Sequence, residues 1–118
     1  MSSPQIDVLR GTLDLLILKA LSWGPAHGYS VAAWIERVTA SALQIEEGSL
    51  YPALHRLDER GLIEAEWGLS GTNRRAKYYT LTTRGREALK QESATWTRYV
   101  RAVFAALEAP AALKPARA

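Results

Sequence analysis

The fold of this 118-residue chain is decided by residues 49–82, which read SLYPALHRLDERGLIEAEWGLSGTNRRAKYYTLT. Ser49 is a good N-cap, and a proline three residues later suits the first turn of a helix. Leu50, Leu54 and Leu57 recur at the spacing of one helical face. A glycine at position 61 is typical of a helix end. These features predict a helix that starts near Ser49, buries its leucines and stops at Gly61.

The residues that follow this helix predict a β-hairpin. Residues 62–67 alternate apolar with small or polar side chains, which is the period of a half-buried strand. Residues 68–73 are rich in turn formers, and residues 76–82 are rich in aromatic and β-branched side chains. We therefore expect two strands joined by an exposed tip that carries basic residues.

Two more helices are predicted ahead of residue 49. The first runs from Thr12, as its cap, to about Trp23, and the second runs over residues 28–39 after a turn at residues 24–28. Residues 40–48 form a short connection. Leu15 and Leu18 fall outside the apolar stripe of the first helix. A helix that is apolar nearly all round is buried on more than one side, so this helix needs a second partner.

The order helix, helix, helix, strand, turn, strand, helix predicts a mainly α fold with a small β-hairpin, the winged helix-turn-helix. In this architecture the third helix enters the major groove of DNA, and the hairpin, called the wing, reaches the adjacent backbone or minor groove. We assign residues 1–82 to this DNA-binding domain.

The distribution of charge supports contact with nucleic acid. Residues 69–90 hold six Lys and Arg against one acid, although the net charge of the whole chain is only +3. A helical wheel leaves polar side chains on the outer face and at the start of the third helix. The predicted DNA contacts are Ser49, Tyr51, Pro52, His55 and Arg56 on that helix and Thr72, Asn73, Arg74, Arg75 and Lys77 on the wing. The alternative is an ordinary solvated helix surface and a wing whose charges serve solubility.

The last helix is predicted over residues 83–108 and is followed by a disordered tail, residues 109–118. At 1.5 Å per residue it is about 39 Å long, longer than a body of about 25 to 30 Å. Its exposed apolar seam predicts a homodimer. The expected interface residues are Leu15, Leu18, Trp96, Val100, Val103, Phe104 and Leu107. Trp96 either packs in this interface or lines a slot for a flat aromatic effector.

Composition argues against other classes of function. The chain has no cysteine and only two histidines, and it lacks a glycine-rich phosphate loop, so we expect no enzyme, no cofactor and no metal. The longest apolar stretch is too short to span a membrane, and we expect a cytoplasmic protein. The remaining alternative is a winged-helix module that binds other proteins and not DNA, and the basic wing argues against it.

The motifs together resemble the PadR-like transcriptional regulators. The resemblance covers residues 9–108 and rests on LRGTLDLLIL (9–18), GPAHGY (24–29), EEGSLYPALHRL (46–57), GLI (61–63), Trp67 and NRRAKYYTLT (73–82). It implies a cytoplasmic, dimeric regulator, usually a repressor, that binds a palindromic operator on double-stranded DNA. It also implies release from DNA by a small aromatic ligand in many members. The single C-terminal helix is similar to the branch with a compact dimerisation element.

Overall fold

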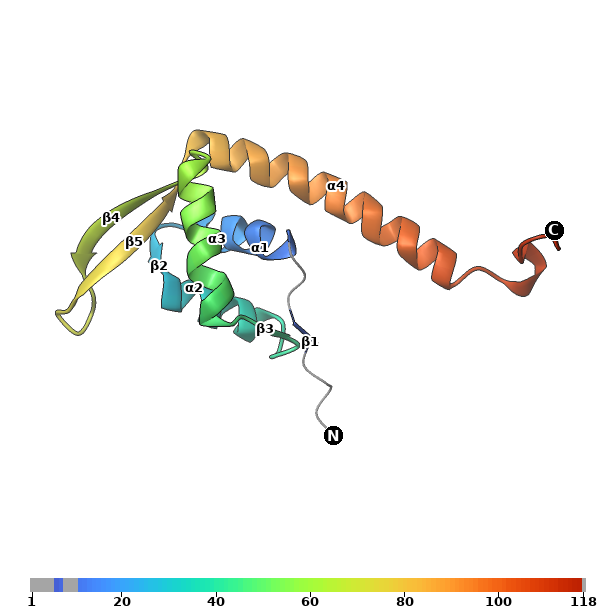
Figure 1. Cartoon of the computed structure of the whole chain (residues 1–118), viewed down its shortest axis with the longest axis horizontal. Helices are drawn as coiled ribbons and strands as arrows, with labels where there is room; N and C mark the ends of the chain where they lie inside the picture. Colours follow the sequence, from blue (N-terminus) through green and yellow to red (C-terminus); the bar gives the residue numbers. More distant parts are fainter. Residues whose placement is uncertain (1–5, 8–10, 118) are drawn as a thin grey trace.

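The computed structural model describes residues 6–7 and 11–117. Its α-helices are α1 (Thr12–Leu21), α2 (Gly28–Val38), α3 (Glu47–Glu59) and α4 (Thr83–Leu107). Its strands are β1 (Ile6–Asp7), β2 (Ala26–His27), β3 (Leu43–Gln44), β4 (Ile63–Leu69) and β5 (Arg75–Leu81), and a short 3-10 helix spans Ala111–Leu113. Three helices, a hairpin and a long last helix follow one another, which confirms the predicted winged helix-turn-helix (Figure 1).

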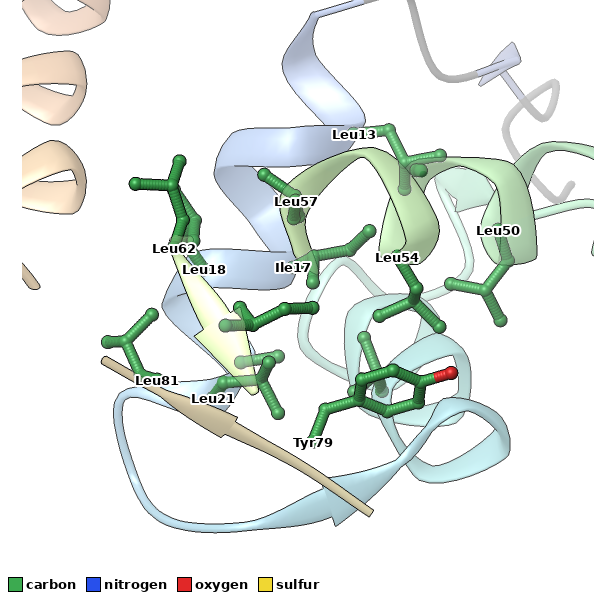
Figure 2. Close-up of a cluster of buried hydrophobic side chains, with 14 of the residues drawn as sticks. Leu13, Ile17, Leu18, Leu21, Leu50, Leu54, Leu57, Leu62, Tyr79 and Leu81 are labelled. Atoms are coloured by element: carbon green, nitrogen blue, oxygen red, sulfur yellow. The ribbon is translucent and has the colours of Figure 1, made fainter. Parts of the chain in front are cut away.

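The hydrophobic core lies where α1, α2 and α3 meet the root of the β4–β5 hairpin (Figure 2). Ile17 and Leu21 of α1, Leu54 and Leu57 of α3 and Ile63 of β4 are each at most 1 % exposed. Burying one such side chain stabilises the fold by about 1.5–3 kcal/mol. The core therefore fixes one face of α3 against the body and leaves the opposite face to solvent.

The first helix differs from its prediction in two respects. Gly11 occupies the N-cap position with a φ of 92°, so Thr12 is the first helical residue and not the cap. The helix ends at Leu21, before the predicted Trp23. Leu18 is 0 % exposed inside a single chain, and its assignment to a dimer interface is wrong because it offers no surface to a partner. Leu15 is half-buried and keeps part of its surface.

The start of α3 also differs from its prediction. The backbone N–H groups of Ser49 and Leu50 both donate to the carbonyl of Glu46 at 3.0 Å, so the helix begins at Glu47. Ser49 is therefore not the N-cap, and Pro52 lies in the second turn. A proline there has no N–H to donate to the carbonyl four residues earlier, that of Gly48.

The end of α3 follows the prediction at Gly61, whose φ is 73°. The N–H of Leu62 donates to the carbonyl of Leu57, and the N–H of Gly61 donates to that of Asp58, both at 3.0 Å. This pair of bonds is a Schellman motif, which needs a left-handed residue and so favours glycine. The chain turns sharply at this point and enters the wing.

The wing is an antiparallel hairpin in which Ile63 pairs with Leu81 and Leu69 pairs with Arg75. The short β2 adds a third strand on the other side of β5. A separate parallel pair joins β1 to β3. These three two-residue strands were not predicted from the sequence, because two residues are too few to show a period.

The long helix α4 begins directly after the wing. Thr82 is its N-cap and is held by three hydrogen bonds: its N–H donates to the Leu62 carbonyl (3.1 Å), its hydroxyl donates to the Gly61 carbonyl (2.7 Å), and its Oγ1 accepts from the Gly85 N–H (3.0 Å). The helix packs on α1 near its start and then leaves the body (Figure 1). The molecule is consequently elongated, 64 × 38 × 22 Å.

The distal part of α4 is exposed, and so are residues 109–117. No described helix combines the length and the apolar character that crossing a membrane requires.

Candidate nucleic-acid interface

A cleft of about 1020 Å³ opens between α3 and the wing. Six of the predicted DNA contacts line it: Tyr51, His55, Thr72, Arg74, Arg75 and Lys77. The remaining four, Ser49, Pro52, Arg56 and Asn73, are exposed but stand outside its described lining. The fold thus brings the outer face of α3 and the basic wing to one surface.

The α3 wall of the cleft presents a phenol and an imidazole. Tyr51 is 50 % exposed, and its ring rests over Gly28, where an added Cβ would lie 3.1 Å from Cε1 of the tyrosine. The Nε2 atom of His55 lies 3.0 Å from Oε1 of Glu59, one turn further along the helix. Both side chains are exposed groups that can donate to or accept from a base edge.

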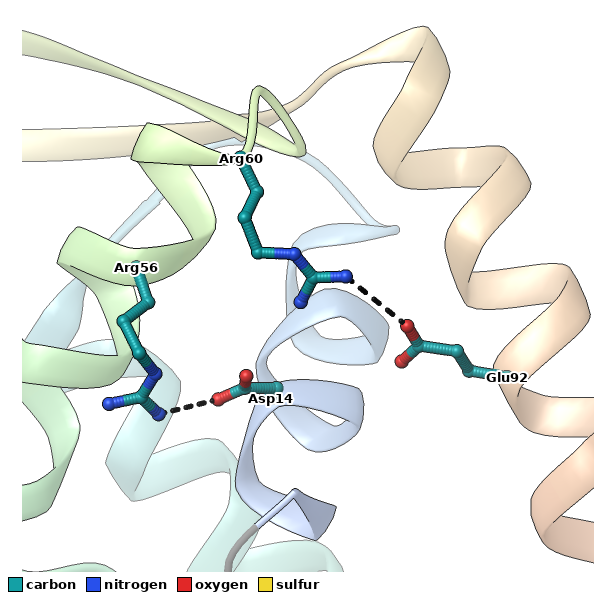
Figure 3. Close-up of polar contacts among 4 residues, drawn as sticks. All are labelled: Asp14, Arg56, Arg60 and Glu92. Atoms are coloured by element: carbon teal, nitrogen blue, oxygen red, sulfur yellow. Dashed lines mark hydrogen bonds and ion pairs between the residues drawn. The ribbon is translucent and has the colours of Figure 1, made fainter.

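Arg56 projects away from the cleft and toward α1. Its Nη2 atom donates to Oδ1 of Asp14 at 3.0 Å, as Figure 3 shows. The side chain of Asp14 is only 15 % exposed, so this ion pair is partly shielded from water. Arg60, one turn later, reaches Glu92 of α4 with 3.9 Å between the charged atoms (Figure 3). These two pairs connect the exposed flank of α3 to α1 and α4.

The tip of the wing is built around Ser70. The N–H of Ser70 donates to the carbonyl of Arg74 at 2.7 Å, and its hydroxyl accepts from the N–H of Arg74 at 3.2 Å. The same hydroxyl lies 3.0 Å from Oγ1 of Thr72, and Asn73 takes the left-handed conformation with a φ of 61°. These bonds hold the tip in one shape, which presents Arg74 and Arg75 at the cleft.

Four aromatic residues of the cleft were missed by the sequence analysis: His27, Tyr29, Trp67 and Tyr79. The ring of Trp67 lies 4.6 Å from the guanidinium carbon of Arg75 and 6.0 Å from the Nζ atom of Lys77. The strand alternation places Trp67 on the side of β4 that carries Ile63. That alternation is the signal in the sequence that places Trp67 on the same face as the buried root of the strand.

Two of these four residues, His27 and Tyr79, come from the neighbouring strands β2 and β5. His27 is the N-cap of α2, and its Nδ1 accepts a hydrogen bond from the N–H of Ser30 at 3.2 Å. Burial raises the pKa of Tyr79, and the neighbouring Tyr51 and Asp58 raise it further. The Tyr79 phenol therefore stays neutral at physiological pH and can serve as a hydrogen-bond donor.

A second hollow, of about 530 Å³, lies between the start of α1 and the middle of α4. Leu15 and Trp96, both predicted interface residues, line it together with Thr12, Glu92 and Tyr99. The rings of Trp96 and Tyr99 are stacked, with centroids 5.7 Å apart and planes at 27°. Val103, Phe104 and Leu107 lie further along α4 and are 40 %, 55 % and 76 % exposed.

Among the described residues no three His, Cys, Asp or Glu side chains are grouped in a way that could hold a metal ion. The cleft between α3 and the wing offers aromatic rings, cations and hydroxyl groups. The hollow between α1 and α4 offers aromatic rings, hydroxyl groups and one carboxylate.

Comparison with known proteins identifies a family and solved structures of similar fold. A model of the PadR-like family of transcriptional regulators matches residues 17–91. The crystal structure of a PadR family transcriptional regulator from Eggerthella lenta DSM 2243 is similar, with a TM-score of 0.71 and 34% identity over 86% of each chain. A PadR-like regulator from Bacillus cereus strain ATCC 14579 gives a TM-score of 0.74 and 28% identity, over 86% of this chain and 97% of that one.

A curated relative extends the comparison. The negative transcriptional regulator PadR of Bacillus subtilis (strain 168) is 29% identical over 77 residues, which are 65% of this chain and 42% of that protein. The family match covers more than half of the chain and includes α2, α3 and the wing. This chain therefore belongs to the PadR-like family of DNA-binding transcriptional regulators.

Proposed function

We propose that this regulator binds a palindromic operator as a homodimer and represses transcription from the promoter that contains it. The observation that carries the proposal is the cleft between α3 and the wing. Its described lining holds Arg74, Arg75 and Lys77 against a single acid, Asp58. Cations on the wing supply affinity for phosphates, and exposed polar groups on α3, led by His55, read the edges of bases.

The homodimer follows from the apolar surface of α4. Val103, Phe104 and Leu107 lie on a part of the helix that leaves the body, and they expose aliphatic and aromatic surface that a second copy can cover. A two-fold axis along α4 would place the two α3 helices on successive major grooves, about 34 Å apart. Each subunit would then meet one half of a palindrome.

Repression is the direction that the Bacillus subtilis relative favours, because that protein is described as a negative transcriptional regulator. A dimer seated over a promoter excludes polymerase by occupying the same DNA. Since its target is the chromosome, we place the protein in the cytoplasm.

We further propose that a small aromatic ligand releases the regulator from DNA. The hollow beside Trp96 is also lined by Leu15, Tyr99 and Thr12, whose side chain carries a hydroxyl group. The stacked rings of Trp96 and Tyr99 suit a flat aromatic molecule. A ligand there would change the spacing of the two α3 helices only to the extent that it prefers the misfitting state. Plain packing of Trp96 in the dimer is the alternative.

The experiment measures DNA binding at a series of salt concentrations. Binding is monitored by the fluorescence anisotropy of a labelled duplex from the upstream region of the gene. The double variant Arg74→Ala/Arg75→Ala should weaken binding to every duplex and flatten the plot of log Kd against log salt by about one unit for each lost phosphate contact. The matched control is Arg86→Ala/Lys90→Ala, which removes the same charge from exposed positions on α4.

The control should retain the wild-type slope. An equal loss in both double variants would mean that net charge alone drives binding and would reject the wing assignment. A wild-type protein that binds no duplex at low salt would favour the protein-binding alternative.

A further inference from the structure

We propose that Trp67 is a positioning residue for DNA binding, which holds the side chains of Arg75 and Lys77 over its ring so that they face the phosphate backbone. The inference rests on the proposed contact between the wing and DNA. It concerns a residue on β4 that the predicted contact set does not contain.

The register of the hairpin places the three residues on one face. Trp67 pairs directly with Lys77, and Arg75 lies two residues away on the same strand as Lys77. Side chains two residues apart along a strand share a face, and diagonal neighbours are within reach of a large ring. The indole is therefore able to meet both cations, at 4.6 Å and 6.0 Å.

The same face changes its environment along the strand. Near the root of the wing it carries Ile63 and Leu81, which are 0 % and 6 % exposed and belong to the core. Beyond Tyr79 the core ends, and the face becomes the wall of the cleft. Trp67 is 56 % exposed there, so it does not serve as core packing.

The acids of β4 lie on the other face. Glu66 pairs with Tyr78 and Glu64 pairs with Thr80, one and three register positions away from the Trp67–Lys77 pair. Alternation directs their side chains away from the cleft. The hairpin thus separates its carboxylates from the two cations, and neither Arg75 nor Lys77 forms an ion pair with a described residue.

An aromatic ring and a carboxylate differ in how many N–H donors of a bound cation they leave available to other partners. A carboxylate would hold a guanidinium through its N–H groups, whereas a ring attracts the cation through its face and leaves N–H groups at the edge available. Two neighbouring cations also repel, and the negative face of the indole offsets part of this repulsion. Trp67 therefore restrains the side chains of Arg75 and Lys77 and leaves their N–H groups available to donate to phosphates.

The test is a double-mutant cycle on DNA affinity. Trp67→Leu keeps an apolar side chain but removes the ring, and it should weaken binding to specific and non-specific duplexes about three- to tenfold. Trp67→Phe keeps a ring and should retain most of the affinity. In the Arg75→Ala/Lys77→Ala background, Trp67→Leu should have no further effect, because the cations that it positions are gone.

Two further readouts separate this role from others. In the free protein, ring current should shift the Arg75 Hδ resonances upfield, and Trp67→Leu should abolish the shift. The melting temperature of Trp67→Leu should stay within a few degrees of the wild type, as expected for an exposed ring.

If Trp67→Leu weakens DNA binding in the background that lacks both cations as much as it does in the wild type, then Trp67 contacts DNA itself. That result would overturn the positioning role. An absent ring-current shift would overturn it as well. A wild-type protein without salt-dependent binding would instead refute the wing–DNA contact, which is judged separately from the cycle.

Discussion

Replacing Gly85 by alanine should destabilise the fold more than any other glycine-to-alanine change in the described chain. Gly85 is buried in the first turn of α4, under the point where α3 passes into the wing. A Cβ at this position would lie 2.0 Å from the carbonyl oxygen of Leu62 and 2.7 Å from Cδ1 of Leu81. The first distance is more than 1 Å shorter than an ordinary van der Waals contact.

The cost follows from which atom obstructs the methyl group. The Leu62 carbonyl belongs to the backbone and accepts the N–H of Thr82 at 3.1 Å, so it cannot move without breaking the cap of α4. Overpacking usually costs about 1–3 kcal/mol, and a rigid obstacle places this variant at or above about 3 kcal/mol. The higher helix propensity of alanine returns at most about 1 kcal/mol.

The assay is thermal unfolding monitored by circular dichroism at one fixed protein concentration, since the melting temperature of the proposed dimer would depend on concentration. A loss of about 3 kcal/mol should lower the melting temperature by about 10 °C or more for a domain of this size. Gly48→Ala is the matched control: Gly48 lies in α3, and an added Cβ there meets nothing within 4 Å. It should melt at or slightly above the wild-type temperature. A Gly85→Ala protein that melts within 3 °C of the wild type would refute the packing argument.

Four further predictions concern DNA binding and assembly. His55→Ala should weaken binding to the true operator by about 1 to 3 kcal/mol and to non-specific DNA by less, as measured by anisotropy; equal losses would show that His55 only positions the protein. Asp14→Asn should free the guanidinium of Arg56, raise non-specific affinity severalfold and steepen the salt slope by about one unit; an unchanged slope would mean that Arg56 cannot reach a phosphate. In the proposed dimer Leu107→Asp would bury an unpaired charge, so this variant should sediment as a monomer; a wild-type monomer at micromolar concentration would contradict the interface. Planar aromatic compounds should quench tryptophan fluorescence in the wild type but not in Trp96→Phe and should weaken operator binding; a binder that leaves operator affinity unchanged would remove the effector role.

Periodicity predicted the long elements well and the ends of the helices less well. The spacing of Leu50, Leu54 and Leu57 located α3 and its buried face, and Gly61 located its end. The start was wrong because capping preference pointed to Ser49, whereas the extended backbone of Glu46 begins the helix without any side-chain cap. Local preference is a weak guide where the preceding segment is held by tertiary packing.

The short strand β2 shows a second limit. Ala26 and His27 carry no periodic signal, and they become a strand because they pair with Tyr79 and Tyr78 of β5. That pairing depends on contacts across some 50 positions of sequence, which no local pattern can reveal. The same pairing brings His27 to the edge of Tyr78, with ring centroids 5.7 Å apart.

The sequence predicted which elements carry the candidate site, but it did not predict where every side chain on them points. A helical wheel placed Arg56 among the exposed residues of α3, and it is 46 % exposed. The wheel gives no information about Asp14, which is 42 residues away in sequence and binds the guanidinium. The assignment of Leu18 to the dimer interface was wrong for a related reason. Its position outside the apolar stripe of α1 suggested a partner chain, but other parts of the same chain already bury it.

The joint at Thr82 has a consequence for how the chain tolerates changes of length. Only this residue separates the end of β5 from the start of α4, so the wing and the long helix are fixed in rotational phase. One residue inserted here would turn α4 by about 100° about its own axis. Val103 and Leu107 would then face a different direction relative to the DNA surface, although every local element could still form. Length variation among related chains should therefore fall in the tip at residues 70–74 or after residue 108, where it leaves this phase unchanged.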